Sequence, residues 1–336
     1  MSSVCILGGG NIAHSLAAAI TETQSVMVVT RRPGMWLPRI TYKQAGAYGE
    51  SRYTVESTSN PAAIADYDII FIALPQFAVE EVLGRAEPYL KKGQTIAFVP
   101  APSKADLYTQ RLKAKGVDVV GFQRVPFISR IVEYGSVVSI SEPREIHRIA
   151  VSDDSLKVQW QRYCKSWFQG KVEFLSSFLI FAFSNSNPLL HPARVVVLLR
   201  GGDGGCYSEC PYFYAGWTDE SSELYLKADE EARQVFHAYT TQQQFEDYEP
   251  VLRHYGVSSP VELTAKIRNI EGFRSILAPW QKIGEKWRPD FSSRYFTEDV
   301  PYGTNVIRSY AHQFGLHTPV IDQLAITCQR ASSGAI

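Results

Sequence analysis

Hydrophobic and polar positions follow two different patterns along the chain. In about the first 150 residues, short apolar runs rich in β-branched residues alternate with helical segments, which is typical of a doubly wound parallel sheet. The expected strands are residues 4–7, 25–30, 67–73, 95–99, 117–121 and 135–140. From about residue 153 the apolar positions recur at helical spacing. We therefore predict an α/β domain over residues 1–152 and an all-α domain over residues 153–336, a division that the length of 336 residues also favours.

The first apolar run leads directly into a glycine-rich turn and then into a helix-like segment. Gly8, Gly10 and Ala13 match the G-x-G-x-x-G/A spacing of dinucleotide-binding turns. In that motif the first glycine makes the tight turn, the second lets the backbone approach the pyrophosphate, and the small third residue lets the helix pack on the strand. The context predicts a Rossmann domain rather than a glycine turn of another α/β fold. The residues expected to contact the cofactor here are Gly8, Gly10, Asn11, Ile12 and Ala13.

The end of the second expected strand bears on which nucleotide is bound. An acidic residue that accepts from the ribose 2′-hydroxyl of NAD is expected there, but the chain has Thr30, Arg31 and Arg32. A hydroxyl and two guanidinium groups suit a 2′-phosphate, because guanidinium can donate two hydrogen bonds to phosphate oxygens. We predict NADP(H), with NAD(H) as the alternative if the arginines are only solvated loop charges.

Two further strand ends are expected to line the cofactor cleft. Leu74 and Pro75 follow the strand at 67–73, and Pro100 follows the strand at 95–99. Ligands of such sheets bind outside the carboxyl ends of the strands. The alternative is that these prolines only terminate their strands.

Charge and composition exclude several classes of partner. Lysine plus arginine and aspartate plus glutamate number 34 each, so no global field favours nucleic acid or an anionic membrane. No apolar stretch approaches the roughly eighteen residues of a membrane span, and no basic segment precedes the first strand. Five cysteines are few and odd in number, which indicates a reducing compartment. We expect a cytoplasmic protein without a metal, in which Cys206 and Cys210 are free thiols because no second pair accompanies them.

Two polar segments of the helical half carry candidate chemistry. Asn187 and His191, with two prolines, interrupt strongly apolar flanks, and Arg294 and Asp299 lie in the segment 294–303. A lone histidine on an apolar face is more often a hydrogen-bonded core residue than a catalyst. An imidazole whose second nitrogen contacts a carboxylate is instead suited to proton transfer at neutral pH. Asp299 is the candidate for that carboxylate.

Together these two segments resemble the octopine/nopaline (opine) dehydrogenase family. The matching residues are Asn-Pro-x-x-His-Pro at 187–192 and Arg-Tyr-x-Thr-Glu-Asp-Val-Pro-Tyr-Gly at 294–303. The resemblance implies a Rossmann domain joined to a helical domain, and the NAD(P)H-dependent reductive condensation of an amino acid with a 2-oxo acid such as pyruvate. It also implies that His191 transfers protons, that Asp299 is its partner, and that Arg294 holds the substrate carboxylate.

Other residues stay ambiguous at this point. Asn187 either binds substrate or caps the helix that bears His191, and Arg130 is interpreted as a domain-bridging ion pair rather than a catalytic group. Thr304 departs from the family, in which an apolar residue usually follows Tyr-Gly. The segment from about 200 to 290 shows no match to the family, which leaves the amino acid and the 2-oxo acid unassigned.

The resulting hypothesis is an NADP(H)-dependent opine dehydrogenase acting on small molecules, with a homodimer as the candidate assembly. One alternative keeps the fold and changes the substrate, as in a reductase of 2-oxo acids similar to ketopantoate reductase. Those enzymes usually use a lysine, and no lysine here lies in a comparable motif. The other alternative is a nucleotide-binding sensor without turnover, since a fold alone does not define a function.

Overall fold

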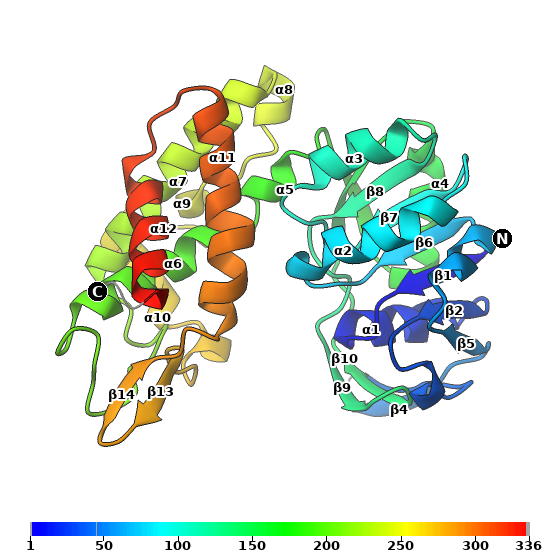
Figure 1. The fold of residues 1–336 in the computed structure, drawn as a ribbon, viewed down its shortest axis with the longest axis horizontal. Helices are drawn as coiled ribbons and strands as arrows, with labels where there is room; N and C mark the ends of the chain where they lie inside the picture. Colours follow the sequence, from blue (N-terminus) through cyan, green and yellow to red (C-terminus); the bar gives the residue numbers. More distant parts are fainter. Residues whose placement is uncertain (1, 45, 334–336) are drawn as a thin grey trace. The chain divides into compact units, whose positions relative to one another are not determined.

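The computed structural model describes residues 2–44 and 46–333, and contacts divide the chain into two compact units, residues 1–181 and 182–336 (Figure 1). The first unit is α/β and the second is mainly helical, so the predicted fold class is confirmed. The predicted boundary after residue 152 is wrong, because the segment up to Phe181 completes the first unit. Its helical periodicity belongs to a helix that packs on the sheet, and periodicity alone does not say against what a helix packs.

An eight-stranded sheet forms the centre of the first unit within the described residues. Its strand order is β12-β11-β8-β7-β6-β1-β2-β5, and neighbouring strands are parallel except for β8 and β11. Residues of β1 and β6 are buried along their whole length, as expected for strands covered on both faces. The strands are β1 Val4–Leu7, β2 Val26–Val29, β5 Val55–Thr58, β6 Ile69–Ile72, β7 Thr95–Phe98, β8 Asp118–Phe122, β11 Ile146–Val151 and β12 Lys171–Leu175.

A second, smaller sheet of the first unit has the order β4-β3-β10-β9. The expected strand at 135–140 lies in this sheet as β10 and does not extend the parallel series, which corrects the prediction. Its burial alternates between half-buried and buried positions, the pattern of a sheet covered on one face only. The strands are β3 Thr41–Gln44, β4 Ala47–Glu50, β9 Ser129–Glu133 and β10 Val137–Ile140.

Helices cover both faces of the large sheet. Trp160 and Phe168 pack edge to face on Phe71 and Phe122 of the sheet, with ring centroids 5.8–6.4 Å apart. Tyr108 packs against Phe98, with ring centroids 5.8 Å apart. The helical elements are α1 Asn11–Ile20, η1 Pro33–Met35, η2 Pro61–Asp66, α2 Gln76–Ala86, η3 Glu87–Tyr89, α3 Ala105–Lys113, α4 Leu156–Tyr163, the π-helix η4 Cys164–Phe168 and α5 Ile180–Phe183.

The second unit is built around helix α6, Asn187–Arg200. Nearly all of its residues are buried, because α7, α12 and the π-helix η6 pack against it. A helix that is apolar on all sides belongs in the interior of a helical assembly. The other elements are α7 Asp219–Tyr239, α8 Gln242–Phe245, α9 Val251–Tyr255, α10 Pro260–Arg268, η5 Glu271–Phe273, η6 Tyr295–Thr304, α11 Asn305–Gln313 and α12 Pro319–Ser332. In the described part of the chain, no helix combines the length and the apolar character that crossing a membrane requires.

One element departs from the all-α expectation for this unit. Strands β13 Trp280–Ile283 and β14 Lys286–Pro289 form an antiparallel hairpin. Its two-residue turn places Gly284 at φ +62°, a conformation that glycine adopts without strain. The glycine turn between two short segments rich in large residues is the sequence signal that identifies this hairpin.

His14 of α1 connects the large sheet to the small one. Its ring is fully buried, Nδ1–H donates to Gly10 O at 2.9 Å, and Nε2 accepts from the Gly135 N–H at 2.8 Å. Burial lowers the pKa of His14 below its usual 6.5. A second proton on Nε2 would face the Gly135 N–H donor, so the folded protein requires the neutral ring.

We expect the free energy of unfolding to fall as the pH drops below about 6.5, the usual value for histidine in an unfolded chain. The sign follows because the folded state binds fewer protons than the unfolded state, so stability is present above that pH and declines below it. Denaturant unfolding at about pH 7.5 and about pH 5.5 should show a smaller loss for His14→Gln than for the wild type. His254→Gln, at an exposed position, is the control. An equal loss in His14→Gln and the wild type would contradict this role.

Candidate active site

The glycine turn between β1 and α1 has the geometry of a nucleotide-binding turn. Gly8 has φ +137°, and a Cβ at this position would lie 2.4 Å from Ala73 O, so only glycine fits. At Gly10, by contrast, no described heavy atom lies within 4 Å of a Cβ position, so space remains above the turn. Gly10 caps α1 without a side-chain hydrogen bond, which leaves helix N–H groups for an anion. The turn therefore has the open space and the free N–H groups that a dinucleotide pyrophosphate would need.

Residues Asn11 to Ala13 contribute mainly to the fold around this turn. Asn11 Oδ1 accepts from the Ile131 N–H at 2.8 Å, and its carbonyl accepts from Ser129 at 3.0 Å. Ala13 is buried and Ile12 is half-buried. The Asn11 side chain is hydrogen-bonded to β9. The predicted contact of Asn11 with the cofactor would therefore involve its backbone rather than its side chain.

The end of β2 presents positive charge beside an aromatic ring. Arg31 and Arg32 are exposed, and within the described ranges neither is paired with a carboxylate. Tyr134 lies next to them, with its hydroxyl 3.3 Å from Thr30 Oγ1 and its ring centroid 5.7 Å from Arg32 Cζ. No sequence motif points to Tyr134, because about a hundred residues separate it from Thr30.

Leu74, Pro75 and Pro100 lie where the sequence predicts them. They directly follow β6 and β7, and these strands run parallel to β1, so all three residues are at the edge of the sheet that carries Gly8. Pro75 is also the N-cap residue of α2, which agrees with a terminating role. Both interpretations of the prolines therefore fit their positions.

His191 and Asp299 meet inside the second unit. His191 Nδ1 lies 2.7 Å from Asp299 Oδ2, and Nε2 lies 3.0 Å from the hydroxyl of Tyr214. The exposed fractions of the His191 and Asp299 side chains are only 8% and 13%. Burial raises the pKa of Tyr214, so its hydroxyl stays protonated. In the neutral ring Nδ1–H donates to Asp299, and Nε2 accepts from Tyr214.

Aromatic rings enclose the imidazole. The ring centroid of His191 lies 4.2 Å from that of Tyr295 and 5.5 Å from that of Phe213. Phe213 and Tyr214 were not identified from the sequence, because the segment 200–290 shows no motif. Tyr295 lies in the 294–303 motif but was given no role there. Low polarity around a hydrogen-bonded imidazole and carboxylate strengthens their interaction.

A proline inside α6 helps to bring the two segments together. Pro192 has no N–H to donate to the carbonyl of Pro188, four residues earlier. Thr304 Oγ1 donates to that carbonyl at 2.6 Å, and the Thr304 side chain is fully buried. Thr304, which departs from the family pattern, thus satisfies a carbonyl on α6 and holds η6, which carries Asp299, against it.

Arg294 and Asn187 are exposed. Arg294 Nε donates to the buried carboxylate of Glu298, and this contact raises the pKa of Arg294. Asn187 begins α6, and its backbone N–H donates to Asn185 Oδ1 at 3.2 Å. The capping interpretation of the Asn187 side chain is therefore wrong, because Ser186 is the N-cap residue and Asn187 is the first residue of the helix. Arg130 on β9 is exposed and donates to Ser129 O at 3.0 Å.

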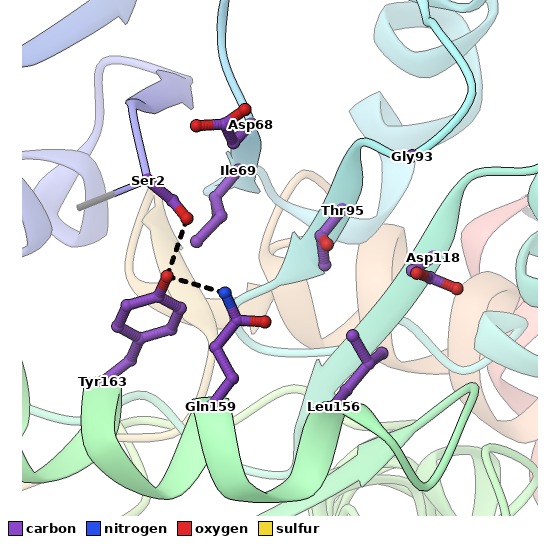
Figure 2. A pocket seen from close by; sticks show the side chains of 9 residues that line it. All are labelled: Ser2, Asp68, Ile69, Gly93, Thr95, Asp118, Leu156, Gln159 and Tyr163. Atoms are coloured by element: carbon purple, nitrogen blue, oxygen red, sulfur yellow. Dashed lines mark hydrogen bonds between the residues drawn. The ribbon is translucent and has the colours of Figure 1, made fainter.

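Other candidate positions show no reactive arrangement. Figure 2 shows a pocket of about 490 Å³ at the amino ends of β6, β7 and β8, the edge opposite the glycine turn. Its tyrosine, Tyr163, bonds to Ser2 and Gln159, each at 2.8 Å, and its Asp118 pairs with Lys113 at 2.8 Å. Cys206 and Cys210 are half-buried free thiols. Among the described residues no group of His, Cys, Asp and Glu is placed to hold a metal.

Comparisons with known proteins agree with this arrangement. Residues 174–332 match the model of the alpha-helical domain of NAD/NADP octopine/nopaline dehydrogenase, and residues 3–99 match that of NADP oxidoreductase, coenzyme F420-dependent. Octopine dehydrogenase of Pecten maximus is 24% identical over 97% of this chain and 89% of its own. Tauropine dehydrogenase of Arabella iricolor is 24% identical over 98% and 91%. A structure of octopine dehydrogenase with NADH and L-arginine has a TM-score of 0.83 at 22% identity, covering 98% and 89%.

The fold and the matches to relatives indicate an NAD(P)-dependent dehydrogenase with a nucleotide-binding domain and a helical domain. The helical unit carries the buried His191–Asp299 pair. The chain resembles the opine dehydrogenases over both of its units, so the resemblance that its two motifs predicted is confirmed.

We expect Thr304→Val to lower the free energy of unfolding by about 1–3 kcal/mol, because it leaves the buried Pro188 carbonyl without a donor at almost unchanged volume. Thr297→Val is the matched control on the same segment. Thr297 is exposed, and its hydroxyl donates to Ser293 O at 3.2 Å. This control should change stability by less than about 0.5 kcal/mol. Denaturant unfolding measures both, and equal effects would contradict the role of Thr304.

Proposed function

We propose that the protein is an NADP(H)-dependent opine dehydrogenase that condenses the amino group of an amino acid with a 2-oxo acid and reduces the product to a secondary amine. The observation that carries the proposal is the buried His191, held between Asp299 and Tyr214. The relatives named octopine, tauropine and opine dehydrogenase support the reaction class.

The residues of the first unit suit the cofactor. Gly8, Gly10 and the N-terminus of α1 would hold the pyrophosphate, and Thr30, Arg31 and Arg32 would hold a 2′-phosphate. The bound dihydronicotinamide supplies the hydride. The preference for NADP(H) rests on the two guanidinium groups that have no carboxylate partner in the part of the chain that the structure describes.

His191 moves protons during imine formation. Condensation joins the amine nitrogen to the carbonyl carbon and releases the carbonyl oxygen as water, so the nitrogen loses two protons and the departing oxygen gains two. With Tyr214 moving aside, neutral His191 accepts these protons at Nε2 from the nitrogen, one at a time, and returns each to the leaving oxygen. Asp299 stabilises the imidazolium that forms in between, because its carboxylate bonds to Nδ1–H.

Arg294 is proposed to orient the 2-oxo acid. Glu298 occupies Nε of Arg294, which leaves the edge formed by the two terminal nitrogens for a substrate carboxylate. Asn187 lies one helical turn before His191, on the same side of α6, and is proposed to contact substrate.

Two alternative functions predict different results in activity assays. Solved structures of ketopantoate reductases have a TM-score of 0.63 or lower at 14% identity or less, which shows a shared fold only. Oxidation of NADPH by a 2-oxo acid without an amine would favour that activity. Cofactor binding without turnover over a panel of amines and 2-oxo acids would favour a sensor. A cytoplasmic location and a homodimer stay predictions.

Replacing His191 by alanine should lower turnover about a hundredfold or more, because the reaction loses its general acid and base. Cofactor binding should be unchanged, since the glycine turn lies in the other unit. Steady-state oxidation of NADPH and cofactor fluorescence measure the two quantities. His254→Ala, at an exposed position, is the control. An unaltered rate in His191→Ala would remove the assignment.

Replacing Arg31 and Arg32 together by alanine should raise KM for NADPH about tenfold or more, because hydrogen bonds to a charged phosphate contribute roughly 1.5–3 kcal/mol each. KM for NADH should change little. The matched control is Arg52→Ala, which removes an exposed arginine that pairs with Glu22. A wild-type preference for NADH, or equal effects on both cofactors, would reject the assignment of the 2′-phosphate to this pair.

A further inference from the structure

A second pocket of the first unit, which the proposed reaction does not use, has arginine at three of its six lining positions. Its volume is about 190 Å³, and it lies where the end of β8 meets the start of β11. The lining residues are Gln123, Arg124, Arg144, Ile146, His147 and Arg148. Three arginines therefore line a space that is smaller than the roughly 300 Å³ at which pockets for larger ligands begin.

The positive charge of this pocket is only partly balanced. Arg148 pairs with Glu173 at 2.9 Å. Arg144 is half-buried and its Nε donates to Val125 O at 2.9 Å, a neutral partner. Arg124 is exposed, and in the described ranges no carboxylate is paired with it. Burial, together with the charge of Arg124, lowers the pKa of Arg144. The pocket thus offers an uncompensated positive field.

His147 adds a buried polar atom without a partner. Its exposed fraction is 2%, and Nε2–H donates to Phe168 O at 3.3 Å. Burial is the largest cause that lowers the pKa of His147, so the neutral ring is favoured. Nδ1 then carries a lone pair, yet among the described residues it has no hydrogen-bond donor. Buried polar atoms are nearly always paired with protein, water or ligand, so this nitrogen is available to accept from a group that is not part of the chain.

We propose that this pocket binds monohydrogen phosphate. The phosphate oxygens accept from the guanidinium groups of Arg124 and Arg144, and its one P–OH group donates to Nδ1 of His147. Sulfate has the same shape and charge, but it has no proton to donate near neutral pH. The lone pair on Nδ1 therefore distinguishes the two anions, which the guanidinium groups alone do not.

Titration calorimetry of the full chain with inorganic phosphate, with NADPH present to occupy the glycine turn, tests the proposal. We expect saturable binding to the wild type, and sulfate about tenfold weaker, as for the loss of one hydrogen bond. Arg124→Gln, at an exposed position that leaves the fold intact, should weaken phosphate binding about tenfold or more. Arg85→Gln is the matched control, since Arg85 is exposed and pairs with Glu81 on α2. It should bind as the wild type does.

The ring nitrogens of His147 locate the bound anion. Nitrogen NMR of the seven histidines should show a phosphate-dependent shift of His147 Nδ1 that is absent in Arg124→Gln. Three results would overturn the proposal: no saturable phosphate binding, equal binding by Arg124→Gln and the wild type, or equal affinity for sulfate and phosphate. Because nothing in this test involves His191 or turnover, it succeeds or fails independently of the proposed reaction.

Discussion

The hydrogen bond between His191 and Asp299 is the interaction on which the chemistry of the second unit depends. Burying a carboxylate is costly unless it is paired and hydrogen-bonded. The fold meets that cost by packing η6 against α6, and Pro192 takes part because it leaves a carbonyl free for Thr304. The irregular backbone at Pro192 and in η6 therefore contributes to the site, in keeping with the frequent occurrence of π-helical turns at functional positions.

The first unit positions positive charge locally in a chain whose net charge is zero. Arg31 and Arg32 follow β2, and Arg124 follows β8, so both groups lie at the carboxyl edge of the large sheet. Ligands of parallel sheets bind at this edge because the connecting loops and helix N-termini converge there. A net charge of zero therefore does not exclude individual anion sites. Such sites depend on which arginines lack a carboxylate partner.

Most departures from the sequence-based expectations have one physical origin. The local pattern of hydrophobic and polar residues indicates which residues are buried. It does not indicate which other segments of the chain cover them. The helix that carries Trp160 is helical as expected, yet it packs on Phe71 and Phe122 of the first unit. Likewise β10 is a strand as expected, but it pairs with β3 and β9. For this reason the division between the two units lies after Phe181 and not after residue 152.

The sequence alone indicated the glycine turn, the strands β1, β2, β6, β7 and β8 of the large sheet, the resemblance to opine dehydrogenases and the pairing of His191 with Asp299. These features depend on local spacing and short motifs, which a chain carries before it folds. Only the tertiary structure decided that Tyr214 bonds to His191, that Tyr134 lies beside Arg32, and that Thr304 satisfies Pro188. Each of these contacts joins residues far apart in the chain, and no local pattern encodes which distant segments will meet.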